Sequence, residues 1–445
     1  MEHKTLVFIV VVSFTALFGC RSLEPANPRG EAPAELITQE PGDRLTPPLV
    51  YDASSTARPM NPIPNETYNM IHQLSDFSFD LFRELSRTKP GEGFSFSPVS
   101  LNMALAVVYS GAREETRQQM ARLMGFYEDE DLFHKSYFDY FSTLGQMFDD
   151  TLVEFNMANR VFIEKTYQVL ESFRQNVNAW HGGAFEQVDF ISQPRQSEQR
   201  INRWVEQITR DRIQNLIPEG TLTEFTRLVI ANAIYIKSSW RYPFEKDSTR
   251  EKMFNSVGGE KIPVDFMIQR ENGIPWLEME DRLVIQLPYT SPNLSLLLIR
   301  PHATGVADLS SYVPDARTYK EMLARLRPEE VHMEIPKFKL ETTFGLAEVL
   351  EQMGMENAFD ERADFSGISP EGDLAISEII QKVFFEIDEE GSEAAAATAI
   401  IVVTTSSAFN DPLVFPKYFI ADRPFLFILK ENFFDTPLFI GQYSR

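Results

Sequence analysis

Cysteine is almost absent from this 445-residue chain, in which Cys20 is the only one. A single cysteine cannot form an intramolecular disulfide, so the folded part must be held by packing alone. Histidine is also scarce, and the six histidines show neither a His-x-x-x-His nor a Cys-x-x-Cys spacing. The sequence therefore excludes a disulfide-stapled scaffold and predicts no metal site.

Motifs of catalysis are missing as well. The chain contains no Gly-x-Ser-x-Gly, no Gly-x-Gly-x-x-Gly and no P-loop pattern. The segment 86–89 fits Ser-x-x-Lys, but the motifs that accompany this pattern in penicillin-recognising enzymes are absent. We therefore expect neither a cofactor nor enzymatic activity, and an exported enzyme is the weaker alternative.

Basic residues are outnumbered, with 42 Lys and Arg against 65 Asp and Glu, which gives a formal charge of -23. Such a balance argues against a nucleic-acid groove and against a polyanionic cofactor. Hydrophobic residues nevertheless make up 43% of the chain, so disorder is excluded for most of it. The composition predicts a folded body with a solvated acidic surface.

The N-terminus carries an apolar run from Leu6 to Phe18, which is too short to span a bilayer. We interpret residues 1–19 as a signal peptide. The run ends in Leu17-Phe18-Gly19-Cys20, which resembles a bacterial lipoprotein box and implies lipidation of Cys20. The membrane would then be contacted through the lipid anchor only. An ordinary signal peptide is the alternative.

Residues 20–66 are rich in proline and poor in apolar clusters, as is typical of a tether. A flexible coil of this length spans roughly 35–40 Å, enough to lift a domain away from a membrane. Because Arg21 rather than aspartate follows Cys20, the lipoprotein resemblance implies the outer membrane of a diderm bacterium. Location in the cell envelope or the extracellular space is therefore expected.

Residues 67–445 show no further linker and no internal repeat, which indicates one domain. Helical periodicity dominates its first half, and Ser97 with Pro98 marks the start of a helix. Apolar strands follow at 228–237, 283–287, 294–299 and 383–387. Helices first and strands later, within one unit, predict an α+β fold with large sheets.

One segment can form a loop in one state and a strand in another. It begins with an acidic, glycine-containing hinge of small residues, followed by six β-branched residues at 400–405 that oppose a helix. The hinge consists of Glu389, Glu390, Gly391, Ser392, Glu393, Ala394, Ala395, Ala396, Ala397 and Thr398. We expect this loop-to-strand change to be the mechanism of the protein.

Six ordered blocks of sequence resemble those of the serpins, from about residue 67 to the C-terminus. They are Phe96-Ser97-Pro98-Val99-Ser100, 201–218, Ala231-Asn232-Ala233-Ile234-Tyr235 with Trp240, Ala363-Asp364-Phe365-Ser366-Gly367-Ile368, the hinge, and Ala421-Asp422-Arg423-Pro424-Phe425. The resemblance implies about nine helices, three β-sheets and an exposed reactive loop after the hinge.

The resemblance also implies a function. A target serine protease would cut the loop, and the cleaved loop would insert into the central sheet before the acyl-enzyme is hydrolysed. The expected partner is therefore the protease in a covalent complex with a monomeric inhibitor. A non-inhibitory scaffold or binding lipoprotein is the alternative.

The family's spacing from Gly391 places the reactive bond between Thr405 and Ser406. No Lys or Arg lies between Glu393 and Pro416, so an elastase-like or subtilisin-like target is favoured. Because the following stretch is long, Ser407 or Phe409 are alternatives, and Phe409 would favour a chymotrypsin-like enzyme.

Sheet opening in the family depends on a polar cluster and on a tryptophan at the top of the sheet. Matching motifs place Ser97, Ser100 and Asn232 in the cluster and identify Trp240 as the tryptophan. Gln381 stands where the family usually has histidine. Because an amide does not titrate, we expect the cluster to open without pH sensitivity.

Overall fold

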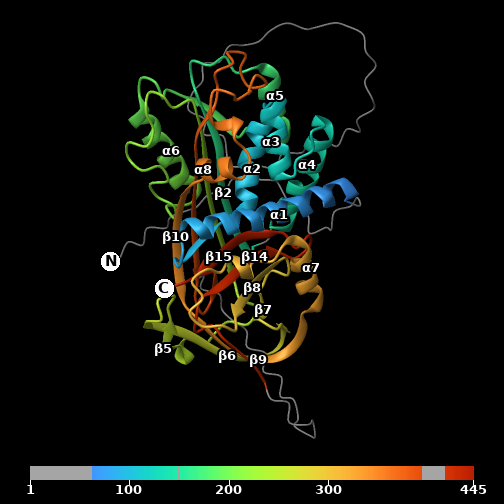
Figure 1. Cartoon of the computed structure of the whole chain (residues 1–445), viewed down its shortest axis with the longest axis vertical. Helices are drawn as coiled ribbons and strands as arrows, with labels where there is room; N and C mark the ends of the chain where they lie inside the picture. Colours follow the sequence, from blue (N-terminus) through green and yellow to red (C-terminus); the bar gives the residue numbers. More distant parts are fainter. Residues whose placement is uncertain (1–62, 149–150, 393–415) are drawn as a thin grey trace, which may run out of the picture. The chain divides into compact units, whose positions relative to one another are not determined.

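The computed structural model describes residues 63–148, 151–392 and 416–445. Within these ranges the chain forms an α+β domain of eight α-helices and two hydrogen-bonded β-sheets. Figure 1 shows how these elements are arranged. None of the described helices is both long and apolar enough to cross a membrane. The proposed signal peptide, Cys20 and most of the tether lie outside the described residues.

The first helix begins two residues before the expected start of the domain. The helices are α1 (Asn65–Thr88), α2 (Pro98–Tyr109), α3 (Glu114–Met124), α4 (Glu130–Met147), α5 (Glu171–Trp180), α6 (Pro194–Ile208), α7 (Ala316–Arg325) and α8 (Ala347–Gln352). The Ser97 side chain accepts a hydrogen bond from the amide of Ser100, and Pro98 occupies the first turn of α2. Every residue of α2 is buried, so this helix forms the centre of the core.

The six-stranded sheet, called the central sheet below, has the order β10-β11-β12-β4-β2-β3. Its strands are β2 (Val153–Glu164), β3 (Phe185–Val188), β4 (Leu228–Ser239), β10 (Phe338–Gly345), β11 (Ile376–Ile387) and β12 (Gly391–Ser392). Side chains alternate between its faces. On β4, Ile234 and Ile236 join the main core, whereas Ala233 and Tyr235 join the apolar cluster beneath α6.

The other nine strands form one continuous large sheet. They are β1 (Phe94–Phe96), β5 (Arg250–Asn255), β6 (Lys261–Glu278), β7 (Arg282–Pro288), β8 (Leu294–Pro301), β9 (Arg327–Pro336), β13 (Lys417–Ile420), β14 (Phe425–Glu431) and β15 (Pro437–Tyr443). The resemblance implied three sheets in all, but the described strands form two. The long strand β6 explains this difference, since it pairs with β5 near one end and with β7 at the other.

Candidate functional site

The hinge enters the central sheet between β4 and β11. Below it, β4 and β11 pair directly in parallel up to Ile234 and Val383. Above this point β12 lies between them, with Ser392 opposite both Ser238 and Ile387. The central sheet is thus closed at one end and already holds the first two residues of an added antiparallel strand at the other. Glu393, Ala394, Ala395, Ala396, Ala397, Thr398, Thr405 and Ser406 lie outside the described residues.

The side chain of Ser392 points into the protein. It is 2% exposed, and its hydroxyl shares a hydrogen bond with the hydroxyl of Tyr289. The Tyr289 ring stacks on Trp240 with 4.5 Å between ring centroids, and burial raises the pKa of the Tyr289 hydroxyl above its ordinary value, so this group stays neutral. Ser392 therefore occupies an inward position, as even-numbered residues of β4 do.

Gly391 is required here because the chain passes very close to β4. A Cβ atom at this position would lie 2.1 Å from the carbonyl oxygen of Ser238 and 2.7 Å from the Cα atom of Ser239. Both are backbone atoms, which cannot move aside as the end of a side chain could. The glycine in the hinge thus permits β12 to enter the sheet.

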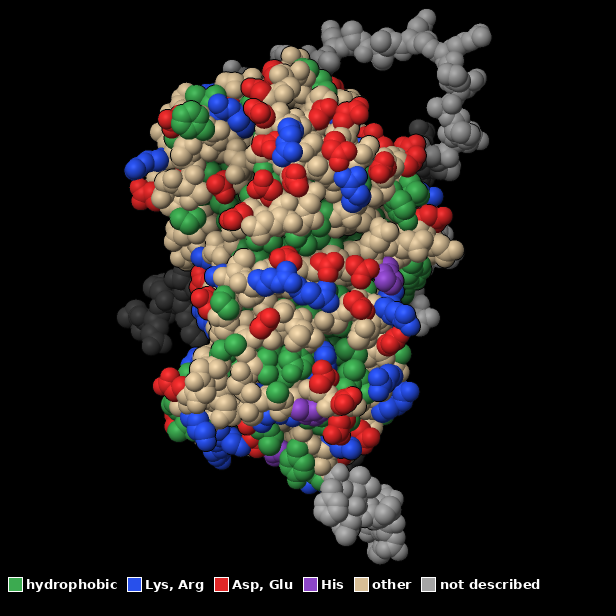
Figure 2. All heavy atoms as spheres, in the orientation of Figure 1, with side chains coloured by type: hydrophobic (Ala, Val, Ile, Leu, Met, Phe, Trp, Pro, Cys, Tyr) green, Lys and Arg blue, Asp and Glu red, His purple; other side chains and the backbone are tan. Residues whose placement is uncertain are grey.

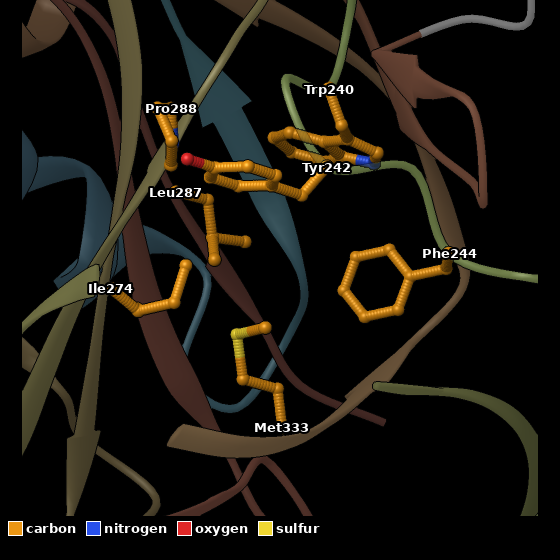
Figure 3. Close-up of a pocket in the computed structure, with 7 residues that line it drawn as sticks. All are labelled: Trp240, Tyr242, Phe244, Ile274, Leu287, Pro288 and Met333. Carbon is orange, nitrogen blue, oxygen red and sulfur yellow. The ribbon is translucent and has the colours of Figure 1, made fainter. Parts of the chain in front are cut away.

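Trp240 fastens the chain that leads into the hinge. Its indole Nε1 donates to the carbonyl of Asp388, and its backbone amide donates to the carbonyl of Glu390, both at 2.8 Å. The backbone amide of Phe244 donates to the carbonyl of Glu389 at 2.8 Å. Figure 3 shows Trp240 and Phe244 beside a small apolar hollow, which is also lined by Tyr242, Ile274, Leu287, Pro288 and Met333.

Two ion pairs hold the acidic hinge residues. The Glu389 carboxylate lies 2.8 Å from Lys337 Nζ and accepts a hydrogen bond from Thr249 at 2.6 Å. Burial raises the pKa of Glu389, but the bonds from Lys337 and Thr249 outweigh it and lower that pKa below its ordinary value. The exposed Lys246 pairs with Glu390 at 2.6 Å. Neither lysine could be predicted as a hinge partner from the sequence, because both are far from the hinge in the chain.

Gln381 is the centre of the expected polar cluster and is fully buried. Its Oε1 accepts from the amide of Ser97 at 2.9 Å, and its Nε2 donates to the Ser97 carbonyl at 2.9 Å and to Asn232 Oδ1 at 2.6 Å. Asn232 Nδ2 in turn donates to Ser100 Oγ at 2.7 Å. The structure therefore brings Ser97, Ser100, Asn232 and Gln381 together and joins α2 to both β4 and β11.

Asn159 of β2 completes this cluster and was missed by sequence reasoning. It lies directly opposite Asn232, and its Oδ1 accepts from Asn232 Nδ2 and from Ser100 Oγ, the latter at 3.0 Å. Its own Nδ2 donates to the Ser100 carbonyl at 3.1 Å. The available signal in the sequence was a polar residue in the middle of a partly apolar strand. The cluster therefore links three neighbouring strands to the end of one helix.

Helix α6 packs on one face of the central sheet through an apolar cluster, and charged contacts add to this packing. The Arg160 guanidinium of β2 lies over the Trp204 ring of α6, 4.6 Å from its centroid. Glu186 of β3 pairs with Arg160 at 2.7 Å and with Arg200 of α6 at 2.6 Å. These contacts join α6 to β2 and β3.

Charged side chains of both signs are spread over the surface of the domain. On the face shown in Figure 2, Asp and Glu side chains lie among Lys and Arg side chains. Among the described residues there is no cluster of three or more His, Cys, Asp or Glu side chains that could hold a metal. The distinctive geometry of the molecule is therefore that of the hinge and the sheet.

Comparisons with known proteins agree with this architecture. Residues 72–445 match the family model described as serpin (serine protease inhibitor). A protein named leukocyte elastase inhibitor from Xenopus tropicalis is 35% identical over 389 residues, covering 84% of this chain and 99% of that protein. An uncharacterised serpin-like protein from Methanosarcina acetivorans is 33% identical over 378 residues, covering 84% and 87%.

A solved structure shows the same arrangement. The crystal structure of Serpin48 from the insect Tenebrio molitor is 29% identical, has a TM-score of 0.75, and covers 86% of this chain and 100% of that one. The relatives come from animals and an archaeon and give no support to a bacterial lipoprotein subtype. The family match over residues 72–445, together with the hinge between β4 and β11, shows that the chain belongs to the serpin family.

Proposed function

We propose that this serpin is a suicide-substrate inhibitor of serine endopeptidases. The protease attacks the loop that follows Ser392 and forms an acyl-enzyme. The cleaved loop then inserts between β4 and β11 and carries the attached protease away before the ester is hydrolysed. The observation that carries this proposal is the position of β12, which starts the new strand in the intact chain.

The register of β12 supports the proposal in detail. If the pairing of Ser392 with Ser238 and Ile387 continues residue by residue, Thr398 comes to lie opposite both Asn232 and Gln381. These residues also face each other in the direct pairing of β4 and β11. A hydroxyl at position 398 would therefore enter the polar cluster, where it can both donate and accept hydrogen bonds.

Side chains decide whether insertion is favourable. Ordering each residue costs roughly 1–2 kcal/mol, whereas each new hydrogen bond contributes only about 1 kcal/mol net. The inward positions fixed by Ser392 contain neither a charge nor a proline; they are Ser392, Ala394, Ala396, Thr398, Ile400, Val402 and Thr404. A strand of fourteen residues, 392–405, would displace the protease by about 45 Å at roughly 3.3 Å per residue.

The target is proposed to be an elastase-like or subtilisin-like enzyme that cleaves between Thr405 and Ser406. Small side chains on both sides of this bond fit a shallow specificity pocket. A relative named leukocyte elastase inhibitor is consistent with this choice. Cleavage after Ser407 or Phe409 would shift the specificity, the latter toward a chymotrypsin-like enzyme.

The decisive experiment incubates the protein with elastase and with subtilisin and follows both partners. We expect an SDS-resistant complex and loss of protease activity near one-to-one stoichiometry. Mass spectrometry of the complex should locate the ester at Thr405. Clean cleavage of the loop with full protease activity would instead support the non-inhibitory scaffold.

We further propose that the protein is exported as a lipid-anchored monomer of the cell envelope. The apolar run at 6–18 and the single Cys20 support this proposal. Labelling with a fatty-acid analogue should mark the protein, and Cys20→Ala should abolish the label and release the protein from membranes. Equal labelling of both forms would refute lipidation at Cys20.

A further inference from the structure

Arg300 is a cation at the end of an apolar strand. Arg300 lies on the same face of β8 as Leu296 and Leu298, because alternate residues of a strand point to the same side. It therefore continues their row of buried side chains. Only 9% of Arg300 is exposed, and its buried Nε has no hydrogen-bond partner. Within the described ranges no ion pair compensates it. Burying a charge without a partner is strongly unfavourable.

A second guanidinium lies nearby. Arg423, in the connection between β13 and β14, donates from Nε to Asp422 at 2.8 Å and from Nη1 to the His302 carbonyl at 2.7 Å. Burial is the first cause that lowers the pKa of Arg300, and the charge of Arg423 lowers it further. Because Arg423 Nη1 contacts the backbone only two residues beyond the largely buried Arg300, the two cations share one poorly solvated region.

Asp422 does not neutralise the pair. Its carboxylate is taken up by Arg423 Nε and also accepts from Asn255 Nδ2 at 3.3 Å. Asp422 raises the pKa of Arg300, but burial and the charge of Arg423 lower that pKa by more. Two guanidinium groups and one carboxylate leave a local excess of one positive charge in a chain that is strongly acidic as a whole.

We propose that Arg300 and Arg423 form a binding site for one compact oxyanion, a carboxylate or a phosphate group. A planar guanidinium matches the oxygens of either group, and desolvation strengthens such a bond. Because the net charge of -23 opposes anions at long range, affinity must come from these local contacts and will be modest. This inference does not depend on protease inhibition.

The test compares thermal unfolding of the full chain in sodium phosphate, sodium acetate and sodium chloride at pH 7 and matched ionic strength. A bound anion stabilises the fold in a saturable way as its concentration rises. We expect the melting temperature to rise in phosphate or acetate relative to chloride. A rise in phosphate alone indicates a tetrahedral group, and a rise in acetate alone indicates a carboxylate; either supports the site.

Arg300→Met should remove the saturable rise in melting temperature. Arg270→Met is the control and should keep this rise, because Arg270 is an exposed strand residue that pairs with Glu330. In chloride, Arg300→Met should be at least as stable as the parent, because an unpaired buried charge is lost. Non-specific stabilisation by phosphate persists in both variants. If Arg300→Met does not fold, Arg300→Lys tests the fork geometry and should weaken the rise. An equal rise in the parent and in a folded Arg300 variant would overturn the proposal.

Discussion

Single residues set how firmly the central sheet is closed, and Gln381 is the clearest case. Its side-chain amide makes two hydrogen bonds with Ser97 and one with Asn232, across the interface that would separate during the proposed insertion. An amide provides donors and an acceptor without changing charge. The replacement of histidine that the sequence indicated is thus chemically adequate at a fully buried position.

We expect Gln381→Leu to lower the free energy of unfolding by about 3 kcal/mol or more, because three buried polar groups lose their partner at roughly 1–3 kcal/mol each. Denaturant unfolding measures this change. Gln286→Leu is the matched control, since Gln286 is half-buried in a strand and its amide makes one bond, to Ser295. Similar losses in both variants would show that the cluster has no special role in stability.

His181 makes stability depend on pH. It is buried against His134, Phe133 and Tyr137, and burial, followed by the charge of His134, lowers its pKa to about 3. The folded state keeps His181 neutral. Its full contribution to folding stability is therefore present above pH 6.5, near the pKa of histidine in the unfolded chain. It is lost progressively as the pH falls from about 6.5 toward 3.

Between pH 7.5 and pH 5.0, His181 should account for about 2 kcal/mol of lost stability, at 1.4 kcal/mol per pH unit below 6.5. His181→Phe should lose less stability over the same interval, whatever its absolute stability. Urea unfolding at the two pH values provides the comparison. Parallel losses in the parent and the variant would contradict the assignment.

At the scale of elements, β12 is the shortest of the described strands and the one on which the proposed function depends. Its place between β4 and β11 requires the missing side chain of Gly391 and is secured by the backbone amides of Trp240 and Phe244. These contacts hold the start of the hinge between the two strands, and the proposed insertion would extend the same pairing.

Gly391→Ala should expel β12 from the central sheet, because its Cβ would meet the Ser238 carbonyl at 2.1 Å. Hydrogen exchange should then show loss of protection at the amides of Trp240 and Phe244. Gly345→Ala, in β10, is the control, since a Cβ there meets no atom within 4 Å. Unchanged protection in Gly391→Ala would mean that β12 is not held as described.

At the scale of the whole molecule, β4 and β11 pair directly below β12, at the place where the proposed insertion would add a strand. Cleavage of the loop near Thr405 should raise the melting temperature by tens of degrees, because insertion adds a full central strand. A protease that cuts the loop without being trapped provides the cleaved sample. A melting temperature that stays within a few degrees of the intact protein would argue against insertion.

Insertion also predicts opposite effects of the same substitution at neighbouring positions. If the pairing of β12 is continued, Ala394 would face inward between Ile236 and Phe385, whereas Glu393 would lie opposite the half-buried Lys237 and Glu386. Ala394→Arg should convert the inhibitor into a substrate, since an unpaired buried charge costs several kcal/mol. Glu393→Arg should still trap protease, as counted from SDS-resistant complex per cleaved inhibitor. Trapping by both would place the register elsewhere.

Sequence patterns predicted some elements well and others poorly, for physical reasons. The start of α2 at Ser97 and Pro98 is local, because capping needs only adjacent residues. Strand β11 was expected from Val383 but begins at Ile376, since Ser377, Glu378, Gln381 and Lys382 interrupt its apolar pattern. Ser377, Gln381 and Lys382 are accommodated by partners from distant elements, which no local pattern reveals.

The sequence by itself determined the family, the α+β class and the hinge, because ordered motifs, periodicity and small residues are written in the linear chain. Only the tertiary structure decided that Asn159, Lys337 and Lys246 belong to the site, and that β12 already lies between β4 and β11. The physical reason is distance along the chain. Hydrogen bonds, ion pairs and strand register join segments that lie far apart in the chain, such as Ser100 with Asn159 and Lys246 with Glu390, and packing alone selects which segments meet.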